Sequence, residues 1–153
     1  MNEKKIAIRA LNPYLTVKGG AEAIEFYKNA FDAELLDCCK SPDGLIMHAQ
    51  LKVGASLFML SDEYPEPQGC GMKAPLTLKG SSVMLQLECT DVDYSFKKAV
   101  KAGAKVVMPI ENQFWGERYG QIEDPFGHRW SLSMLVEKLT RAEINERAKA
   151  FCK

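Results

Sequence analysis

Apolar and polar side chains alternate along several short segments, and a period of two is typical of strands with one buried face. One face of LIMHAQLKV, residues 45–53, carries Met47, Ala49, Leu51 and Val53, and the other carries Ile46, His48, Gln50 and Lys52. Similar alternation follows residues 11–17, 83–89 and 128–135, with Trp130, Leu132 and Met134 on the apolar side of the last segment. We therefore expect strands that pack one face on helices and leave a polar face on the other side.

Between these strands, a period near 3.6 predicts helices. Residues 21–31 place Ile24, Tyr27 and Phe31 on one stripe, and residues 91–104 form a second helix with Asp91 or Asp93 as its N-cap. The final helix, residues 139–152, begins with a capping box of Thr140 and Glu143. The predicted strands are 6–17, 33–39, 45–53, 55–61, 83–89, 105–110, 119–124 and 128–135.

The order strand–helix–strand–strand–strand therefore occurs twice, which indicates a duplicated βαβββ unit. We predict an α+β fold in a single domain spanning residues 1–153. Its parts are module 1 over about 6–61, a long surface loop over 62–80 that is a linker or a lid, module 2 over about 82–135, and the C-terminal helix.

The predicted polar faces are unusual for surfaces that simply contact solvent, because they hold few Lys and Glu residues. They carry Asn, Gln, Ser, Tyr, His and Met side chains and one Arg, a composition that suits a cavity with a few convergent polar groups. A plain solvated face is the alternative.

Charge and composition exclude several classes of function. The chain has 20 Lys and Arg against 20 Asp and Glu, so it lacks the basic excess on which nucleic-acid binding depends. No apolar run approaches the ~18 residues of a membrane span, and the opening MNEKKIAIRALNP has no apolar core of a signal peptide. We therefore expect a cytoplasmic protein. Five cysteines without metal-binding spacing, Cys38, Cys39, Cys70, Cys89 and Cys152, predict reduced thiols.

Three stretches carry a family resemblance: PYLTVKGGAEAIEFYKNAFDAELL, MHAQLKVGASLFMLSDEYPE and ENQFWGERYGQIEDPFGHRWSLS. They resemble the glyoxalase/bleomycin-resistance superfamily, also called the vicinal oxygen chelate fold, over roughly residues 10–135. DPFGHRWSL is the most specific string for the superfamily, and HAQL, FMLSDE and FWGERYG favour its PhnB-like branch. The resemblance implies two βαβββ modules that curve into a cup, a homodimer, and a cup holding either a metal ion with substrate or a bound antibiotic.

In metal-using members of the superfamily, the resemblance places four ligands at positions that correspond here to Asn12, Phe58, Met84 and Ser131. Phenylalanine cannot ligate a metal, and a thioether suits soft ions rather than the divalent metals of this fold. We therefore predict no metal and no other cofactor.

His48 is the one candidate catalytic residue, as a ligand contact or an acid–base group; the alternative is a histidine hydrogen-bonded in a wall. A nucleophile pair of His48 with Cys38 or Cys39 stays open, although no group that would orient it is identified. Phe114 and Trp115 need burial against the cup, a partner subunit or the C-terminal helix. Glu88 and Arg129 could form an ion pair or orient an anion. The predicted ligand-binding residues are Asn12, Tyr14, His48, Gln50, Phe58, Met84, Gln86, Trp115, Tyr119, Arg129 and Ser131.

The predicted function is therefore a PhnB-like homodimer that binds a small organic molecule in a metal-free cup. The alternative is a glyoxalase-type lyase or isomerase that uses a divalent metal through atypical ligands including His48, so whether the protein is an enzyme stays open. A third hypothesis is a structural or interaction role, if Phe58, Met84 and Trp115 fill the cup. The sequence names no ligand, and the modules could pair within one chain or between two.

Overall fold

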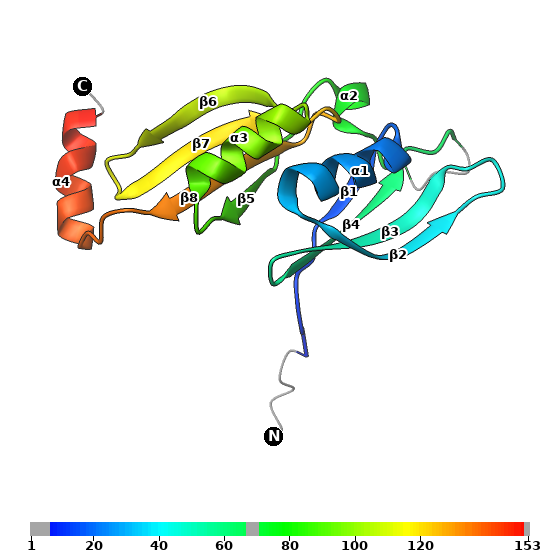
Figure 1. Ribbon diagram of the computed structural model, residues 1–153, viewed down its shortest axis with the longest axis horizontal. Helices are drawn as coiled ribbons and strands as arrows, with labels where there is room; N and C mark the ends of the chain where they lie inside the picture. The colour runs from blue at the N-terminus through cyan, green and yellow to red at the C-terminus, as the bar shows by residue number, and fades with distance from the viewer. Residues whose placement is uncertain (1–6, 67–70, 152–153) are drawn as a thin grey trace.

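The two halves of the chain lie side by side along the long axis of the molecule, and helix α4 stands at the end of the second half (Figure 1). This is a computed structural model, and it describes residues 7–66 and 71–151. Ile6, Cys70 and Cys152 lie outside the described residues, so the predicted start of the first strand and two of the predicted thiols are not described.

Each half contains the predicted βαβββ unit, and the α+β class is confirmed. The elements of the first half are β1 (Tyr14–Val17), α1 (Gly20–Phe31), β2 (Glu34–Lys40), β3 (Ile46–Val53) and β4 (Ser56–Asp62). Those of the second are β5 (Met84–Glu88), α3 (Val92–Ala102), β6 (Lys105–Asn112), β7 (Glu117–Glu123) and β8 (Arg129–Leu135). A short helix, α2 (Pro75–Leu78), lies between the halves, and α4 (Arg141–Phe151) follows them.

Each unit forms its own four-stranded sheet, in the orders β1-β4-β3-β2 and β5-β8-β7-β6. The first strand of each unit pairs parallel with the last one, and the other pairings are antiparallel. Strand β1 begins at Tyr14, later than predicted, because Pro13 has no N–H to donate to a ladder. The predicted loop over 62–80 contains α2, which the sequence pattern did not indicate.

Two predicted helix starts are confirmed by their caps. Asp91 accepts a hydrogen bond from the backbone N–H of Tyr94 at 3.0 Å. Thr140 and Glu143 form the expected capping box, since Glu143 accepts from the backbone N–H of Thr140 at 2.7 Å and Thr140 accepts from that of Glu143 at 3.3 Å.

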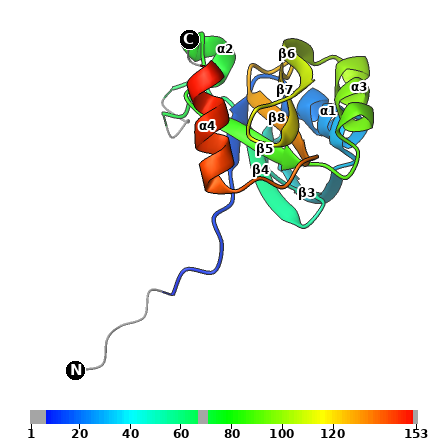
Figure 2. The same ribbon diagram turned by 90° about the vertical axis from the view of Figure 1, so that its left-hand side faces the viewer.

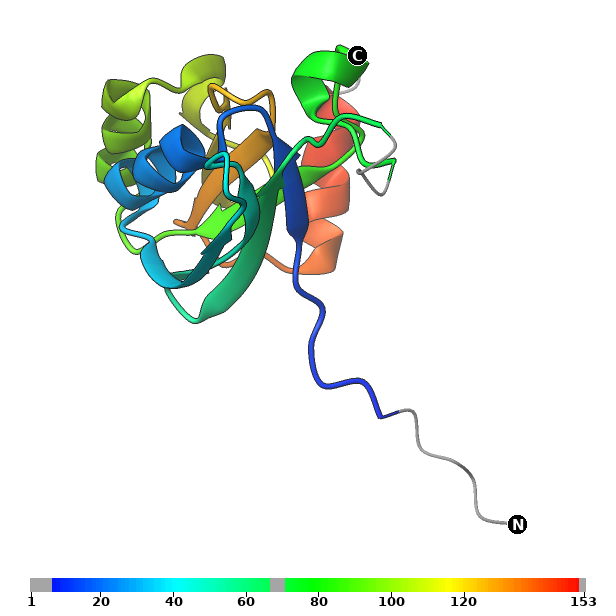
Figure 3. The same ribbon diagram turned by 90° about the vertical axis from the view of Figure 1, so that its right-hand side faces the viewer.

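Helices α1 and α3 both cover one side of the strands, and α2 and α4 lie toward the opposite side (Figure 2). The covered side forms the hydrophobic core, in which Val17, Leu51, Leu60, Ile122 and Leu132 are completely buried. The opposite faces of both sheets therefore carry the polar residues, on the side that Figure 3 shows flanked by α2 and α4.

The carboxylate of Asp124 joins the two halves inside the core. It accepts hydrogen bonds from the Tyr27 hydroxyl of α1 at 2.7 Å and from the Trp130 indole N–H of β8 at 2.8 Å. The backbone N–H groups of Phe126 and His128 also donate to it, both at 2.9 Å. Burial, and then the nearby Asp124 charge, raise the pKa of Tyr27 well above its ordinary value, so its phenol stays protonated and can donate.

The start of β3 departs from the predicted alternation. Ile46 was expected on the polar face and Met47 on the apolar one, but Ile46 is completely buried and Met47 is 50% exposed. An irregularity in the β2–β3 pairing lies just here, between Cys39 and Lys40, and it reverses the faces of the two residues. The buried backbone N–H of Ile46 donates to Asp62 at 2.8 Å.

Candidate functional site

The strands of the second sheet carry five of the eleven predicted binding residues: Met84, Gln86, Tyr119, Arg129 and Ser131. Strand β8 lies between β5 and β7, so its outward residues are flanked on both sides. Ser131 is opposite Gln86 of β5 and Gln121 of β7. One step along the face, Arg129 is opposite Met84 and Glu123.

These polar side chains are joined by a small network of hydrogen bonds. The Gln121 amide donates to the Tyr119 hydroxyl at 3.0 Å, and that hydroxyl contacts the Met84 sulfur at 3.8 Å. The Gln86 amide donates to the hydroxyl of Ser133 at 3.1 Å. These contacts join side chains of all three neighbouring strands, β5, β7 and β8, on this face.

Ser131 lies in the middle of this face, and its hydroxyl takes no part in the network. The residue is completely buried, and its Oγ has no hydrogen-bond partner. A buried hydroxyl without a partner costs about 1–3 kcal/mol, and an ordered water or a ligand can supply the missing bond.

A cavity of about 550 Å³ opens beside this network, between the sheet and α2. Its lining includes Met84 and Arg129, which the sequence predicted, and Gln121 and Glu123, which it missed. Alternation along β7 would have placed both missed residues on the same face as Tyr119. The α2 residues could not be predicted, because their segment shows no hydrophobic periodicity. The rest of the lining consists of Pro75, Leu76, Lys79, Gly80, Ser81, Ser82, Val83 and Gly127.

The predicted pairing of Arg129 with Glu88 is wrong. Arg129 binds Glu123 of the adjacent β7 strand, with 3.0 Å between Nε and Oε2. Parallel pairing places Glu88 opposite Ser133, at the other end of the shared ladder. The Arg129 guanidinium nevertheless lines the cavity, so it still offers a donor to a ligand.

Aromatic residues mark the end of the face nearest α4. The Trp115 ring lies 5.5 Å from the Tyr119 ring, and its indole N–H donates to Glu117 at 2.8 Å. The Phe114 ring packs against Phe151 of α4 at 5.1 Å, which makes the C-terminal helix the burial partner among those predicted.

The polar face of the first sheet holds a second group of predicted residues. The Tyr14 hydroxyl and His48 Nδ1 are hydrogen-bonded at 2.9 Å. Gln50 follows on the same face, opposite Met59 of β4. Asn12 lies before β1 and is exposed. His128, in contrast, is packed between the halves, with its Nε2 3.1 Å from the carbonyl oxygen of Thr16.

Phe58 does not line either polar face, and its predicted place is corrected. It is buried in the core, where its ring contacts Tyr27 at 5.2 Å and Trp130 at 6.0 Å. Alternation along β4 points Phe58, Leu60 and Asp62 toward the helices, so Met59 takes the outward position.

The metal that the superfamily implies does not fit these residues. Of the four corresponding positions, Phe58 points into the core, Met84 offers a thioether, and Ser131 offers a neutral hydroxyl. Across residues 7–66 and 71–151, no group of three or more His, Cys, Asp or Glu side chains is arranged to hold a metal ion. Because these positions do not offer a set of metal-binding donors, we assign no reaction step to a metal ion.

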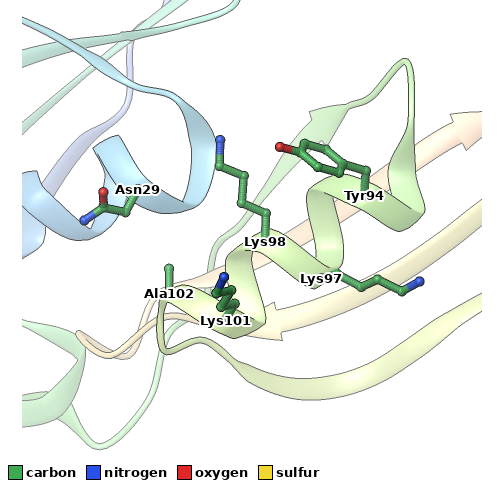
Figure 4. A pocket seen from close by; sticks show the side chains of 6 residues that line it. All are labelled: Asn29, Tyr94, Lys97, Lys98, Lys101 and Ala102. Atoms are coloured by element: carbon green, nitrogen blue, oxygen red, sulfur yellow. The ribbon is translucent and has the colours of Figure 1, made fainter.

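A further cavity, of about 590 Å³, lies on the helix side between α1 and α3 (Figure 4). Its lining consists of Asn29, Tyr94, Lys97, Lys98, Lys101 and Ala102. Lys98 is bound to Asp32, and none of the predicted residues is here. In the part of the chain that the structure describes, no helix is long and apolar enough to cross a membrane.

Two mixed sheets of βαβββ origin, with helices on one side and a polar cavity on the other, define a glyoxalase-type scaffold. The model of the Glyoxalase/Bleomycin resistance protein/Dioxygenase superfamily matches residues 8–132, and the chain belongs to this superfamily. An uncharacterised protein of Mycobacterium bovis is 44% identical over 135 residues, which cover 88% of this chain and 89% of the relative.

Solved structures agree with this fold. A gene product of Arabidopsis thaliana matches with a TM-score of 0.67 and 28% identity, over 83% of this chain and 99% of its own. The PhnB protein of Bacillus cereus matches with a TM-score of 0.64 and 20% identity, over 82% of this chain and 99% of its own. At that identity, the second match supports the fold alone.

Proposed function

We propose that the protein binds a small organic molecule on the polar face of its second sheet, without a resident metal. The observation that carries this proposal is the 550 Å³ cavity, which Met84, Gln121 and Arg129 of the polar face line. The buried, unpartnered hydroxyl of Ser131 belongs to the residue opposite Gln121 in the ladder, outside that lining. A cavity of a few hundred Å³ is the usual size for a small-molecule site. We also propose membership of the PhnB-like branch, which the FWGERYG and HAQL strings support.

The chemistry of the face indicates the kind of ligand. In the cavity, Arg129 supplies a charged donor that Glu123 already neutralises, and Gln121 supplies a neutral amide. The Tyr119 and Ser131 hydroxyls lie on the same sheet outside the lining. Met84 and the Trp115–Tyr119 pair add apolar and aromatic surface. An uncharged or singly charged molecule with a flat apolar part and one or two oxygen atoms would match these groups.

We further propose a homodimer in the cytoplasm. Within one chain, hydrogen bonds join no strand of one sheet to a strand of the other in the described residues. Large apolar side chains are exposed beside the second face, including Val83, Met84, Leu135 and Val136. A second copy would cover them, and sedimentation should then give twice the chain mass of 17.1 kDa. The free thiols of Cys38, Cys39 and Cys89 suit a reducing compartment.

The binding proposal is tested by a thermal-shift screen of aromatic and thiol-containing compounds. Saturation at 100-fold excess over Kd adds ~2.7 kcal/mol for a single site, which should give a melting shift of several degrees. Stabilising compounds should then be titrated against two variants, Gln121→Leu in the proposed cavity and Tyr94→Leu in the α1–α3 cavity.

We expect Gln121→Leu to weaken binding at least tenfold, because one hydrogen bond is lost and its partner is left buried. Tyr94→Leu should bind like the original chain. The reverse result, or a screen without any stabilising compound, would show that this face is not a binding site.

A further inference from the structure

A thiol and an imidazole are neighbours on the polar face of the first sheet. Cys39 of β2 and His48 of β3 are directly opposite each other in the antiparallel pairing. Directly opposed residues project from the same face, with Cβ atoms about 4.5–5.5 Å apart. The Cys39 side chain therefore lies next to the imidazole, and Cys39 is exposed.

The adjacent thiol, Cys38, has a different environment. Cys38 is partly buried and packs against the hydrophobic core, on the other face of the same strand. Two consecutive cysteines thus occupy opposite sides of the sheet, and Cys39 is the one that shares its side with His48. This makes Cys38 an internal reference for the reactivity of Cys39.

Tyr14 supplies the group that orients the histidine. Its hydroxyl is 2.9 Å from His48 Nδ1, and the two ring centroids are 5.6 Å apart. In the tautomer with the proton on Nδ1, this nitrogen donates to the phenol oxygen and Nε2 is left unprotonated. No second hydrogen bond to His48 occurs among the residues that the structure describes, so Nε2 is available as a base.

A nucleophile, a neighbouring base and a third group that orients the base are the parts used in covalent catalysis. Register makes Cys39 and His48 neighbours, and no hydrogen bond between the thiol and the imidazole is formed in the described residues. We propose that Cys39 is a nucleophile activated by His48, with Tyr14 as a positioning residue, and that it adds to α,β-unsaturated carbonyl compounds. The inference concerns the first sheet and goes beyond the ligand binding proposed for the second sheet.

The addition needs no reagent other than the thiol and the enone. His48 Nε2 accepts the thiol proton, and the sulfur forms a bond to the β-carbon of the substrate. The π electrons of the carbon–carbon double bond move toward the carbonyl as an enolate, whose α-carbon then takes the proton back from the imidazolium. No atom leaves, so the product is a saturated thioether with the mass of protein plus substrate.

The neighbouring residues suit a carbonyl substrate. Gln50 lies two residues along β3 on the same face, where its amide can donate to a carbonyl oxygen. The outward position of the next strand is taken by Met59, opposite Gln50, which gives apolar surface for the carbon chain. The charged groups on this face are Glu34, Asp37 and Lys52.

The proposal is tested by limited alkylation with N-ethylmaleimide from pH 6 to 9, followed by site-resolved mass spectrometry. We expect Cys39 to react faster than Cys38 and Cys89, and faster than the same thiol in the urea-unfolded chain. His48→Gln should slow Cys39 at least tenfold at pH 7, within the range of general-base effects. The pH profile of the Cys39 rate in this variant should then match that of the same thiol in the urea-unfolded chain.

Tyr14→Phe keeps the aromatic ring and removes the hydroxyl, so it should lower the Cys39 rate severalfold and shift its pH profile toward that of His48→Gln. Cys38→Ser should leave the rate unchanged. With methyl vinyl ketone as the enone, the original chain and Cys38→Ser should gain one adduct whose mass equals the sum of the reactants, and Cys39→Ser should not.

An unchanged rate and pH profile in His48→Gln would overturn the proposal, as would a Cys39 rate no higher than in the unfolded chain. Thermal melting of each variant shows whether the fold is intact, and Tyr14→Phe provides the test if His48→Gln does not fold. Gln121→Leu should keep the Cys39 rate while it loses ligand binding, so the two proposals fail separately.

Discussion

Ser131 and Ser133 are two residues apart on the same face of β8 and differ in one respect. Both are buried, but Ser133 accepts a hydrogen bond from Gln86, whereas Ser131 has no partner. The second sheet thus contains a matched pair of hydroxyls, one used by the fold and one not. A group that costs stability in the free protein becomes favourable only when something binds it.

The two serines should therefore respond differently to removal of the hydroxyl. Ser131→Ala should leave the free energy of unfolding unchanged or raise it by up to ~1 kcal/mol, because an unsatisfied buried group is removed. Ser133→Ala should lower it by ~1 kcal/mol, because the Gln86 amide loses its acceptor. Urea denaturation of both variants measures the difference, and a clear loss of stability in Ser131→Ala would show that its hydroxyl does have a partner in the folded chain.

Alternation along the sequence was enough to predict this face, since Arg129, Ser131 and Ser133 separate from Trp130 and Leu132 by parity alone. Parity failed at Ile46 and Met47, because a strand irregularity reverses two side chains without any sign in the sequence. The place of Phe58 was carried over from the resemblance and not from its own strand, and β4 turns it into the core. The alternation of residue types thus predicted which face of a strand is polar. Bulges and strand register determine which side chains are in contact, and the sequence pattern does not reveal them.

At the scale of elements, α4 is attached to the second sheet by few contacts. It has no buried residue. Two hydrogen bonds of 2.7 Å join Arg147 to Glu137, which precedes the helix, and Phe151 contacts Phe114. The backbone of Glu137 lies so close to Gly116 that a Cβ there would meet its carbonyl oxygen at 2.3 Å. The sequence predicted the helix and its cap, but these long-range attachments follow no local pattern.

The attachment of α4 should depend on pH. Hydrogen bonds from Arg147 hold the pKa of Glu137 below its ordinary value, and those from Thr140 do the same for Glu143. Carboxylates with a lowered folded-state pKa stabilise the fold fully above their unfolded pKa, ~4.3, and this contribution is lost as pH falls through the lowered values.

We therefore expect NMR signals of α4 to shift together as the pH falls below the unfolded carboxyl pKa of ~4.3, before the sheets unfold. Arg147→Met should remove the part that belongs to Glu137 and loosen α4 already at pH 7. If the α4 signals of the original chain stayed constant down to pH 3, the ion pair would not hold the helix.

At the scale of the whole molecule, one carboxylate connects the two halves through their shared core. Asp124 belongs to the turn after β7, yet it binds Tyr27 of the first module. DPFG was predicted as a turn, and the turn is there, with Phe126, His128 and Trp130 as local donors to the carboxylate. Its fourth donor, Tyr27, comes from a distant part of the chain. No local pattern identifies a contact between residues so far apart in sequence.

Tyr27→Phe should lower the free energy of unfolding by ~1–3 kcal/mol, because Asp124 loses one donor in a buried position. Tyr94→Phe, at a 62% exposed tyrosine of α3, is the control and should change it by less than ~0.5 kcal/mol. Because the pKa of Tyr27 is raised in the folded chain, its contribution is present below the unfolded pKa of ~10 and lost as pH rises further. Equal stability of Tyr27→Phe and Tyr94→Phe in urea would contradict this role.

The hydrogen bond between Tyr27 and Asp124 also makes the two βαβββ repeats different from each other. The first repeat supplies the hydrogen-bond donor, the Tyr27 phenol, and the second supplies the acceptor, the Asp124 carboxylate. The two halves are therefore complementary and cannot replace each other. A hybrid made by joining two first halves would lack the Asp124 carboxylate, and one made from two second halves would lack the Tyr27 phenol. A substitution on one side of this hydrogen bond therefore leaves the group on the other side without this partner.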